Sequence, residues 1–275
     1  MTKKIALLLI CCGTVLTGIY SQTGALNVQK GQQFKVSISI TSNSNVEAMG
    51  QVINTDLKST TLSIYEIDKV MPDEITIKTT IKKMVASLEA MGQSSNFDSD
   101  KKDNGGPLAE QLAEKVNKTR TLQVNGKGII TGGDETAEAI PGTSGSAGKC
   151  ELFEPALLGR TLKVGDSFTD TFSVKQDKLS SRDSGTYTVT AIENGIATIN
   201  YTGIQKLNSV MEQMGMEVSS ASVANVKTEF QMDIQSGVLR SVITELDTTA
   251  TIEVAGTTLP STGKTTTTIR IEPAS

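Results

Sequence analysis

Segments in which apolar and polar residues alternate occur along most of the chain. Between Phe34 and Ile40 every second residue is apolar, and the segment 74–81 alternates in the same way. Successive side chains of a β-strand point to opposite faces, so this period of two predicts half-buried strands. Further runs rich in β-branched residues lie at 186–192, 196–204, 227–234, 238–246, 248–254 and 265–271. The pattern predicts a mainly β fold with antiparallel strands.

The same arrangement of positions occurs twice along the chain. The matched segments are 31–40 with 165–174, 61–68 with 186–193, 81–92 with 204–215, and 128–130 with 237–239. The separation falls steadily, from 134 residues for the first match to 109 for the last. A long internal repeat indicates a duplicated structural unit. The falling separation indicates extra residues in the first copy.

We therefore expect two homologous antiparallel β halves with one or two short helices. They would pack as one sandwich or half-barrel-like body, or follow one another as tandem modules. The first copy spans 22–131 and the second 151–275, and a Gly- and Ser-rich linker at 132–150 joins them. The extra residues of the first copy, about 97–116, form an acidic loop and a helix that begins at Pro107.

Two matched segments, 81–92 and 204–215, fit two kinds of structure. Their apolar residues are spaced as on one face of a three-turn helix that ends at Gly92 or Gly215. The alternating pattern before them also continues into both, as a long hairpin bent at each glycine requires. From the pattern alone, helix and hairpin both remain open.

The N-terminus has the composition of a secretory signal peptide. Lys3 and Lys4 precede an apolar stretch from Ile5 to Ile19, and a polar segment follows. We expect cleavage after Ser21, which makes the chain an exported protein of the periplasm, the cell surface or the extracellular space. Lipid anchoring at Cys11 or Cys12 is the alternative. After cleavage Cys150 is the one remaining cysteine, so no internal disulfide forms and the thiol is expected to be buried.

Composition excludes several classes of function. The chain has no histidine, which rules out Ser-His-Asp and Cys-His catalysis. Loss of Lys3 and Lys4 changes the net charge from −4 to −6, which gives no electrostatic attraction to nucleic acid. Aromatic residues make up only 4% of the chain, too few for the aromatic girdles of a membrane barrel. We therefore expect a mature chain that does not span a membrane.

Several motifs resemble those of an uncharacterised family of exported bacterial proteins, many of them lipoproteins. The segment 163–168 resembles the start of that family's second half, and 186–203 is similar to its next hairpin. The segment 81–100 is similar to the stretch that contains the family's Asp-Ser pair, here Asp98-Ser99. The resemblance implies a β-rich secreted fold and favours the hairpin for 81–92. It implies no activity and no catalytic residues.

The inserted loop of the first copy contains a weak candidate for a cation site. Asp98, Asp100 and Asp103 lie within six residues and offer the carboxylate oxygens that a hard cation prefers. Lys101 and Lys102 lie between them and would repel such an ion, so a solvated acidic loop is the simpler interpretation. No cofactor motif is present, and we expect no cofactor.

Methionines and leucines give the one positive indication of a binding site. Methionine is flexible and polarizable and suits adaptable apolar surfaces. If both copies turn these residues to a shared seam, they would line a cavity for an acyl chain or a hydrophobic peptide; otherwise they fill the core. The residues concerned are Met84, Leu88, Met91, Leu207, Met211 and Met214.

These observations favour an exported, non-enzymatic binding module. Its partner would be a hydrophobic ligand or a protein of the cell envelope. Two alternatives remain: a hydrolase that works with a pair of carboxylates, and a purely structural component of the envelope.

Overall fold

The computed structural model describes residues 22–23, 26–48, 50–101, 107–134, 148–176, 178–213 and 216–274. The predicted signal peptide at 1–21, most of the predicted linker, and Asp103 and Met214 lie outside the described residues.

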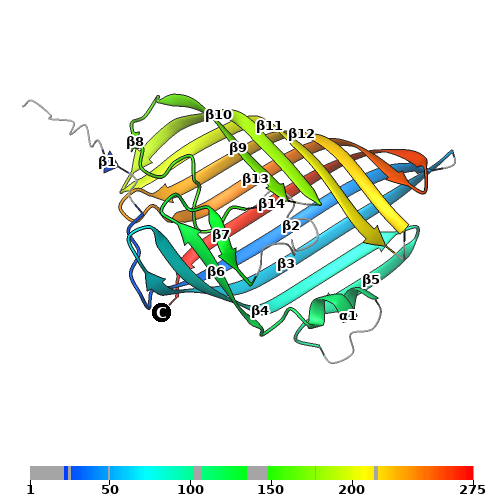
Figure 1. Ribbon diagram of the computed structural model, residues 1–275, viewed down its shortest axis with the longest axis horizontal. Coiled ribbons are helices and arrows are strands. Elements are labelled where there is room, and N and C mark those ends of the chain that lie inside the picture. Colours follow the sequence, from blue (N-terminus) through cyan, green and yellow to red (C-terminus); the bar gives the residue numbers. More distant parts are fainter. Residues whose placement is uncertain are drawn as a thin grey trace, which may run out of the picture.

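Strands dominate the described part of the chain (Figure 1). They are β1 (Gln22–Thr23), β2 (Gln33–Ala48), β3 (Gln51–Val70), β4 (Glu74–Ala90), β5 (Gln93–Asp98), β6 (Thr119–Asn125), β7 (Ile130–Gly133), β8 (Thr161–Leu162), β9 (Ser167–Gln176), β10 (Leu179–Glu193), β11 (Ile196–Gln213), β12 (Met216–Asp233), β13 (Leu239–Val254) and β14 (Thr257–Pro273). The helix α1 spans Pro107–Ala113 and begins at the proline, as expected.

A single antiparallel sheet contains twelve of these strands. Its order is β7-β6-β4-β3-β2-β14-β13-β12-β11-β10-β9, with β5 paired to β4 beyond the end of β6. The mainly β, antiparallel prediction is confirmed, but the sandwich alternative is wrong. β2 and β14 pair from Phe34–Pro273 to Val46–Ser261, so the two halves extend one sheet and do not stack as two. Among the described strands the sheet does not close, since β7 and β9 end it.

Both segments that fitted a helix or a hairpin are strands. Residues 81–90 lie in β4 and residues 204–213 lie in β11, each in a ladder with its neighbours. The helical spacing of the apolar residues in β4 arises at a bulge in β4 itself: Leu62 of β3 pairs with Lys83 and Ser63 with Ile81, which leaves Lys82 as the extra residue. A bulge adds one residue to one strand and shifts which side chains face the core.

The two predicted copies differ at the residues expected as an insertion. In the second copy β12 pairs along all of β11. In the first copy β6 pairs with the first part of β4 and β5 with the last part, and α1 lies between them in the chain. Met84, Ala86 and Phe97 pack there with Ala109 and Leu112 as a small separate core. None of the described helices is long and apolar enough to cross a membrane.

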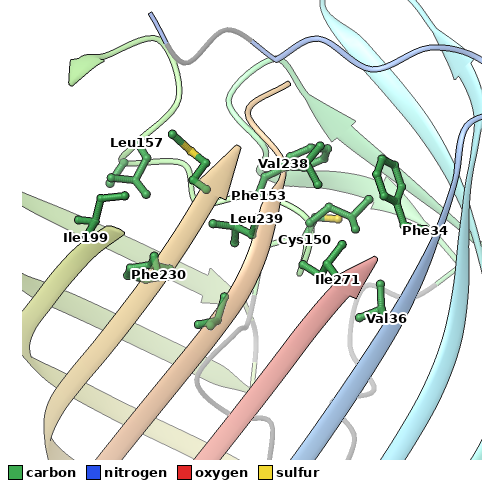
Figure 2. Close-up of a cluster of buried hydrophobic side chains, with 14 of the residues drawn as sticks. Phe34, Val36, Cys150, Phe153, Leu157, Ile199, Phe230, Val238, Leu239 and Ile271 are labelled. Atoms are coloured by element: carbon green, nitrogen blue, oxygen red, sulfur yellow. The ribbon is translucent and has the colours of Figure 1, made fainter. Parts of the chain in front are cut away.

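The main core lies at one end of the curved sheet (Figure 1). There the chain passes from the β7 edge toward the β9 edge, and residues 148–160, which we name the crossing segment, cover the inner face of the sheet. Figure 2 shows Cys150, Phe153 and Leu157 of this segment beside side chains from the ends of the strands, among them Leu239 and Ile271. The backbone N–H of Leu239 donates a hydrogen bond of 2.9 Å to the carbonyl oxygen of Leu152.

The outer face of the sheet is polar. Side chains there are exposed at alternate positions, in register with the buried positions of the inner face. The charged members include Lys35, Lys58, Lys206, Lys227, Glu245 and Lys264. The inner face therefore provides the sheltered surface of the molecule.

Candidate functional site

A cavity of about 130 Å³ lies on the inner face of the sheet, beside the crossing segment. The crossing segment contributes one wall, and inward side chains of β2 and β10 to β14 contribute the rest. Most of the surface is apolar. The apolar lining residues are Ile38, Cys150, Phe153, Tyr187, Tyr201, Val226, Phe230, Leu239, Val242, Leu246 and Ile269.

Glu154 anchors the crossing segment in this wall. Its carboxylate is almost fully buried, and both oxygens accept hydrogen bonds from Lys149 Nζ, at 3.1 and 3.2 Å. Tyr187 of β10 donates a further bond to Glu154 Oε1 at 3.2 Å. A buried charge needs such partners to offset its lost hydration. The Lys149 ammonium also lies 4.9 Å from the centre of the Phe172 ring of β9, a cation–π contact.

A second carboxylate, Asp183 of β10, lies on the same face. Tyr201 of β11 donates a hydrogen bond to Asp183 Oδ1. The Tyr201 ring lies over two glycines that pair across the strands, Gly185 and Gly203. A Cβ atom at Gly185 would meet Tyr201 Cε2 at 2.6 Å, so only glycine leaves room for the ring. An aromatic ring over a strand glycine also shields the backbone there.

Both tyrosines are neutral hydrogen-bond donors. Burial, and then the neighbouring carboxylates, raise the pKa of Tyr187 far above its usual value. Burial and the hydrogen bond to Asp183 raise the pKa of Tyr201 in the same way. The rings of Phe168, Tyr187, Tyr201 and Phe230 lie next to one another, with Tyr187 and Tyr201 centred 4.6 Å apart. The site thus has a rigid aromatic wall with fixed donors.

Cys150 is the lone described cysteine, and the prediction that it is buried is confirmed. Burial raises the pKa of its thiol, and the Glu151 carboxylate adds to the effect. A protonated, enclosed thiol is a poor nucleophile. Cys150 therefore acts as a small apolar side chain of the core.

The structure does not bring the predicted methionine and leucine residues together. Those of the first copy lie on or beside β4. The described ones of the second, Leu207 and Met211, lie on β11, six strand-to-strand steps away, about 29 Å along the sheet. Met84 is buried in the small core under α1, and Met91 is 77% exposed in the β4–β5 turn. Met211 is 51% exposed. Leu88 and Leu207 are partly buried, and neither lines the cavity.

The predicted acidic loop makes ion pairs with lysines. Asp98 pairs with Lys101 at 3.6 Å, and Asp100 pairs with Lys83 of β4. Within the described residues no group of three or more His, Cys, Asp or Glu side chains is arranged to hold a metal ion. Both described aspartates thus have cationic partners in the protein itself.

Sequence reasoning missed the cavity because its polar residues are far apart in the chain. Lys149 lay within the predicted linker, and Glu154 followed directly after it. Gly203 was one available signal, since a glycine inside the predicted strand 196–204 marks close approach of another group.

The chain matches no protein-family model and no curated protein. The resemblance to a family of exported proteins therefore stays a prediction.

Solved structures provide matches of low similarity. They include the attachment invasion locus protein Ail of Yersinia pestis, with 9% identity, TM-score 0.19 and coverage of 89% of this chain and 100% of that chain. OccK7 of Pseudomonas aeruginosa has 6% identity, TM-score 0.31 and coverage of 89% and 100%. An outer membrane channel from Pseudomonas putida F1 has 7% identity, TM-score 0.26 and coverage of 90% and 98%. At these TM-scores we transfer no activity, substrate or partner.

These matches correct one expectation from the sequence. The matches include an outer membrane channel, and the expectation that the mature chain does not span a membrane is withdrawn. That expectation relied on the scarcity of aromatic residues. Strands such as β3 and β11 are longer than the 9–11 residues that a membrane strand needs. Strand length therefore does not support the expectation of a chain that does not span a membrane.

Proposed function

We propose that this chain is an exported, non-enzymatic binding protein that holds the apolar part of a small molecule in the cavity beside the crossing segment. The observation that supports the proposal most is the cavity itself: its lining is mainly apolar, and it lies on the sheltered face of the sheet. Ligand sites of proteins are typically concave, mostly apolar and equipped with a few placed polar groups.

The size of the cavity limits the group that it can hold. An apolar cavity of roughly 150 Å³ accepts a benzene molecule. A volume of about 130 Å³ therefore suits a ring or an alkyl segment of about six carbons. Beyond the cavity the inner face is lined by small side chains such as Ser222 and Ala250, which leave room for the remainder of a longer ligand.

The polar groups of the cavity are arranged for binding and not for hydrolysis. A two-carboxylate mechanism needs one carboxyl group to give or take a proton and a second to attack or to activate water. Both oxygens of Glu154 are held by Lys149, and one oxygen of Asp183 is held by Tyr201. These contacts fix the wall of the cavity and favour a binder over an enzyme.

Calorimetric titration with 1-hexanol tests the proposal. We expect saturable binding at a single site in the chain from residue 22 onward. Replacement Val226→Phe places a larger side chain in the cavity and should abolish the binding. The matched variant Val223→Phe changes an exposed valine of the same strand, on the outer face, and should leave binding unchanged.

Two results would overturn the proposal. One is the absence of any saturable binding of hexanol to the folded protein. The other is equal binding by the Val226→Phe and Val223→Phe variants, with circular dichroism showing that both are folded. Where hexanol binds as expected, native mass spectrometry of the protein purified from its own envelope would identify the natural ligand.

A further inference from the structure

Gln205 of β11 is a buried polar residue whose side chain has no partner among the described residues. It lines the cavity, and only 7% of its surface is exposed. Among the described residues its side-chain amide makes no hydrogen bond to the protein. Every fully buried side-chain nitrogen or oxygen of the described residues has a hydrogen-bond partner, so an amide without one is not fully buried. The Gln205 amide therefore keeps contact with the space of the cavity.

Asp183 is the direct neighbour of Gln205 across the β10–β11 ladder. Directly opposed residues in an antiparallel pair have Cβ atoms about 5 Å apart on the same face. Asp183 Oδ1 is held by Tyr201, whereas Oδ2 accepts no hydrogen bond from the described residues. One carboxylate oxygen and one amide thus lie side by side at the cavity, and both are available to an occupant.

The charge of the cavity wall is negative. Its charged side chains are one lysine, Lys149, and three carboxylates, Glu151, Glu154 and Asp183. Lys149 is bound to both oxygens of Glu154, which offsets its charge locally. Glu151 accepts a hydrogen bond from Tyr65 at 2.9 Å. Among the described residues the Asp183 carboxylate has no cationic partner, and the hydrogen bond that it accepts comes from a phenol.

We propose that the cavity selects ligands that carry a primary ammonium group next to their apolar part, held between Asp183 Oδ2 and the Gln205 side-chain oxygen. This inference rests on the proposed function and specifies its ligand class. An ammonium group has three hydrogen-bond donors and no acceptor, which matches two neighbouring acceptor oxygens. A carboxylate ligand would instead face the Asp183 charge at short range.

Three probes of equal length test the inference: n-hexylamine, 1-hexanol and hexanoate, titrated calorimetrically at pH 7 and low salt. They share the apolar chain and differ in the charge of the terminal group. A hydrogen bond to a charged group in a sheltered site corresponds to about ten- to a hundredfold in affinity. We expect hexylamine to bind more tightly than hexanol by that factor, and hexanoate to bind least.

Two variants assign the preference to the two residues. Asp183→Asn retains an acceptor for Tyr201 and removes the charge, so it should reduce hexylamine affinity about ten- to a hundredfold and change hexanol affinity less. Gln205→Met retains the volume and removes the amide, so it should weaken hexylamine binding several-fold. The matched control is Asp247→Asn, which removes an exposed charge at the outer face and should change neither affinity.

The outcomes separate the inference from the function on which it rests. If hexanol binds and hexylamine binds no more tightly, the ammonium inference is overturned and the apolar site stands. The same holds if Asp183→Asn and Asp247→Asn weaken hexylamine binding equally. If none of the three probes binds, both proposals fall.

Discussion

At the scale of single residues, Gly185 and Gly203 determine the shape of the site. They let the Tyr201 ring lie on the sheet and reach Asp183. A larger residue at either position would push the ring into the cavity. The donor that orients Asp183 would then be displaced.

Replacement Gly203→Ala should therefore destabilise the protein and disturb the site. The new Cβ would meet Tyr201 Cζ at 2.5 Å and the Ser184 carbonyl oxygen at 2.8 Å, so both must move. Overpacking of this kind costs about 1–3 kcal/mol. Urea unfolding of wild type and variant measures this loss as a difference in the free energy of unfolding. Gly126→Ala is the control, because a Cβ there meets nothing within 4 Å, and an equal loss in both variants would contradict the account.

Cys150 reports whether the crossing segment is closed on the sheet. In the chain from residue 22 onward it is the one thiol, fully buried and with a raised pKa. We expect no reaction with a thiol reagent at pH 8 under native conditions and one thiol per chain in denaturant. Rapid labelling of the native protein would show that the segment does not cover the sheet.

Burial of Cys150 was predictable from its residue type, whereas the roles of Glu154 and Asp183 were not. Each is one of many acidic residues, and nothing nearby in the sequence marks it. Their partners Tyr187 and Tyr201 are 33 and 18 residues away in the chain. Such a site is formed by strand register, which local patterns do not specify.

At the scale of elements, alternation predicted the strands well and the bulges poorly. The strand from Phe34 has the expected buried alternate positions. The apolar residues of β4 looked helical because the extra residue of its bulge imitates part of a helical period. β11 has no register shift over 204–213, and its helical spacing includes exposed apolar residues such as Ile204 and Met211. The helix at Pro107 was predictable, since proline at its start and apolar residues on one face are local signals.

The turn between β12 and β13 is held by Asp233. Its carboxylate accepts hydrogen bonds from the backbone of Gln235 and Ser236 and from Arg240 Nη2, the last at 2.6 Å. Burial opposes ionisation, but the bonds from Arg240 and Ser236 outweigh it and hold the pKa of Asp233 below its usual value. The ionised carboxylate therefore stabilises the folded state.

Replacement Asp233→Asn should lower the free energy of unfolding at pH 7 by about 2 kcal/mol. The stabilisation by Asp233 is complete above the unfolded pKa, about 3.9, and is lost as the pH falls through the lower folded value. The difference between wild type and variant should therefore shrink toward about pH 2.5. Urea unfolding at both pH values measures it. A difference that stays constant with pH, or an equal effect of Asp247→Asn, would contradict this role.

At the scale of the whole molecule, the strands of the two predicted copies lie in one sheet. The duplication stays a prediction, and the sequence did not indicate how its halves associate, because the β2–β14 pairing joins residues more than 200 positions apart. With polar side chains on one face of each strand and small ones on the other, the two halves could either stack as two sheets or join as one continuous sheet. The continuous sheet leaves one long inner face, on which the crossing segment creates the cavity.

A designed disulfide between Thr41→Cys and Thr266→Cys tests the pairing of β2 with β14. These residues are direct partners on the outer face, and paired Cα atoms in an antiparallel ladder lie about 4.5–5.5 Å apart, within the reach of a disulfide. We expect an intramolecular bond under mild oxidation. The control pairs Thr41→Cys with Glu245→Cys, two strands away at about 10 Å, and should not form one. Equal cross-linking of both pairs would refute the strand order.

The most direct test of the account locates a bound ligand in the cavity. With n-hexylamine bound to methyl-labelled protein, intermolecular nuclear Overhauser effects identify the side chains that it touches. We predict contacts from its methylene protons to Val226, Val242 and Ile269, which line the cavity from three adjacent strands. Contacts confined to outward residues such as Val223 and Ile243, or no contacts at saturating probe, would contradict the central claim.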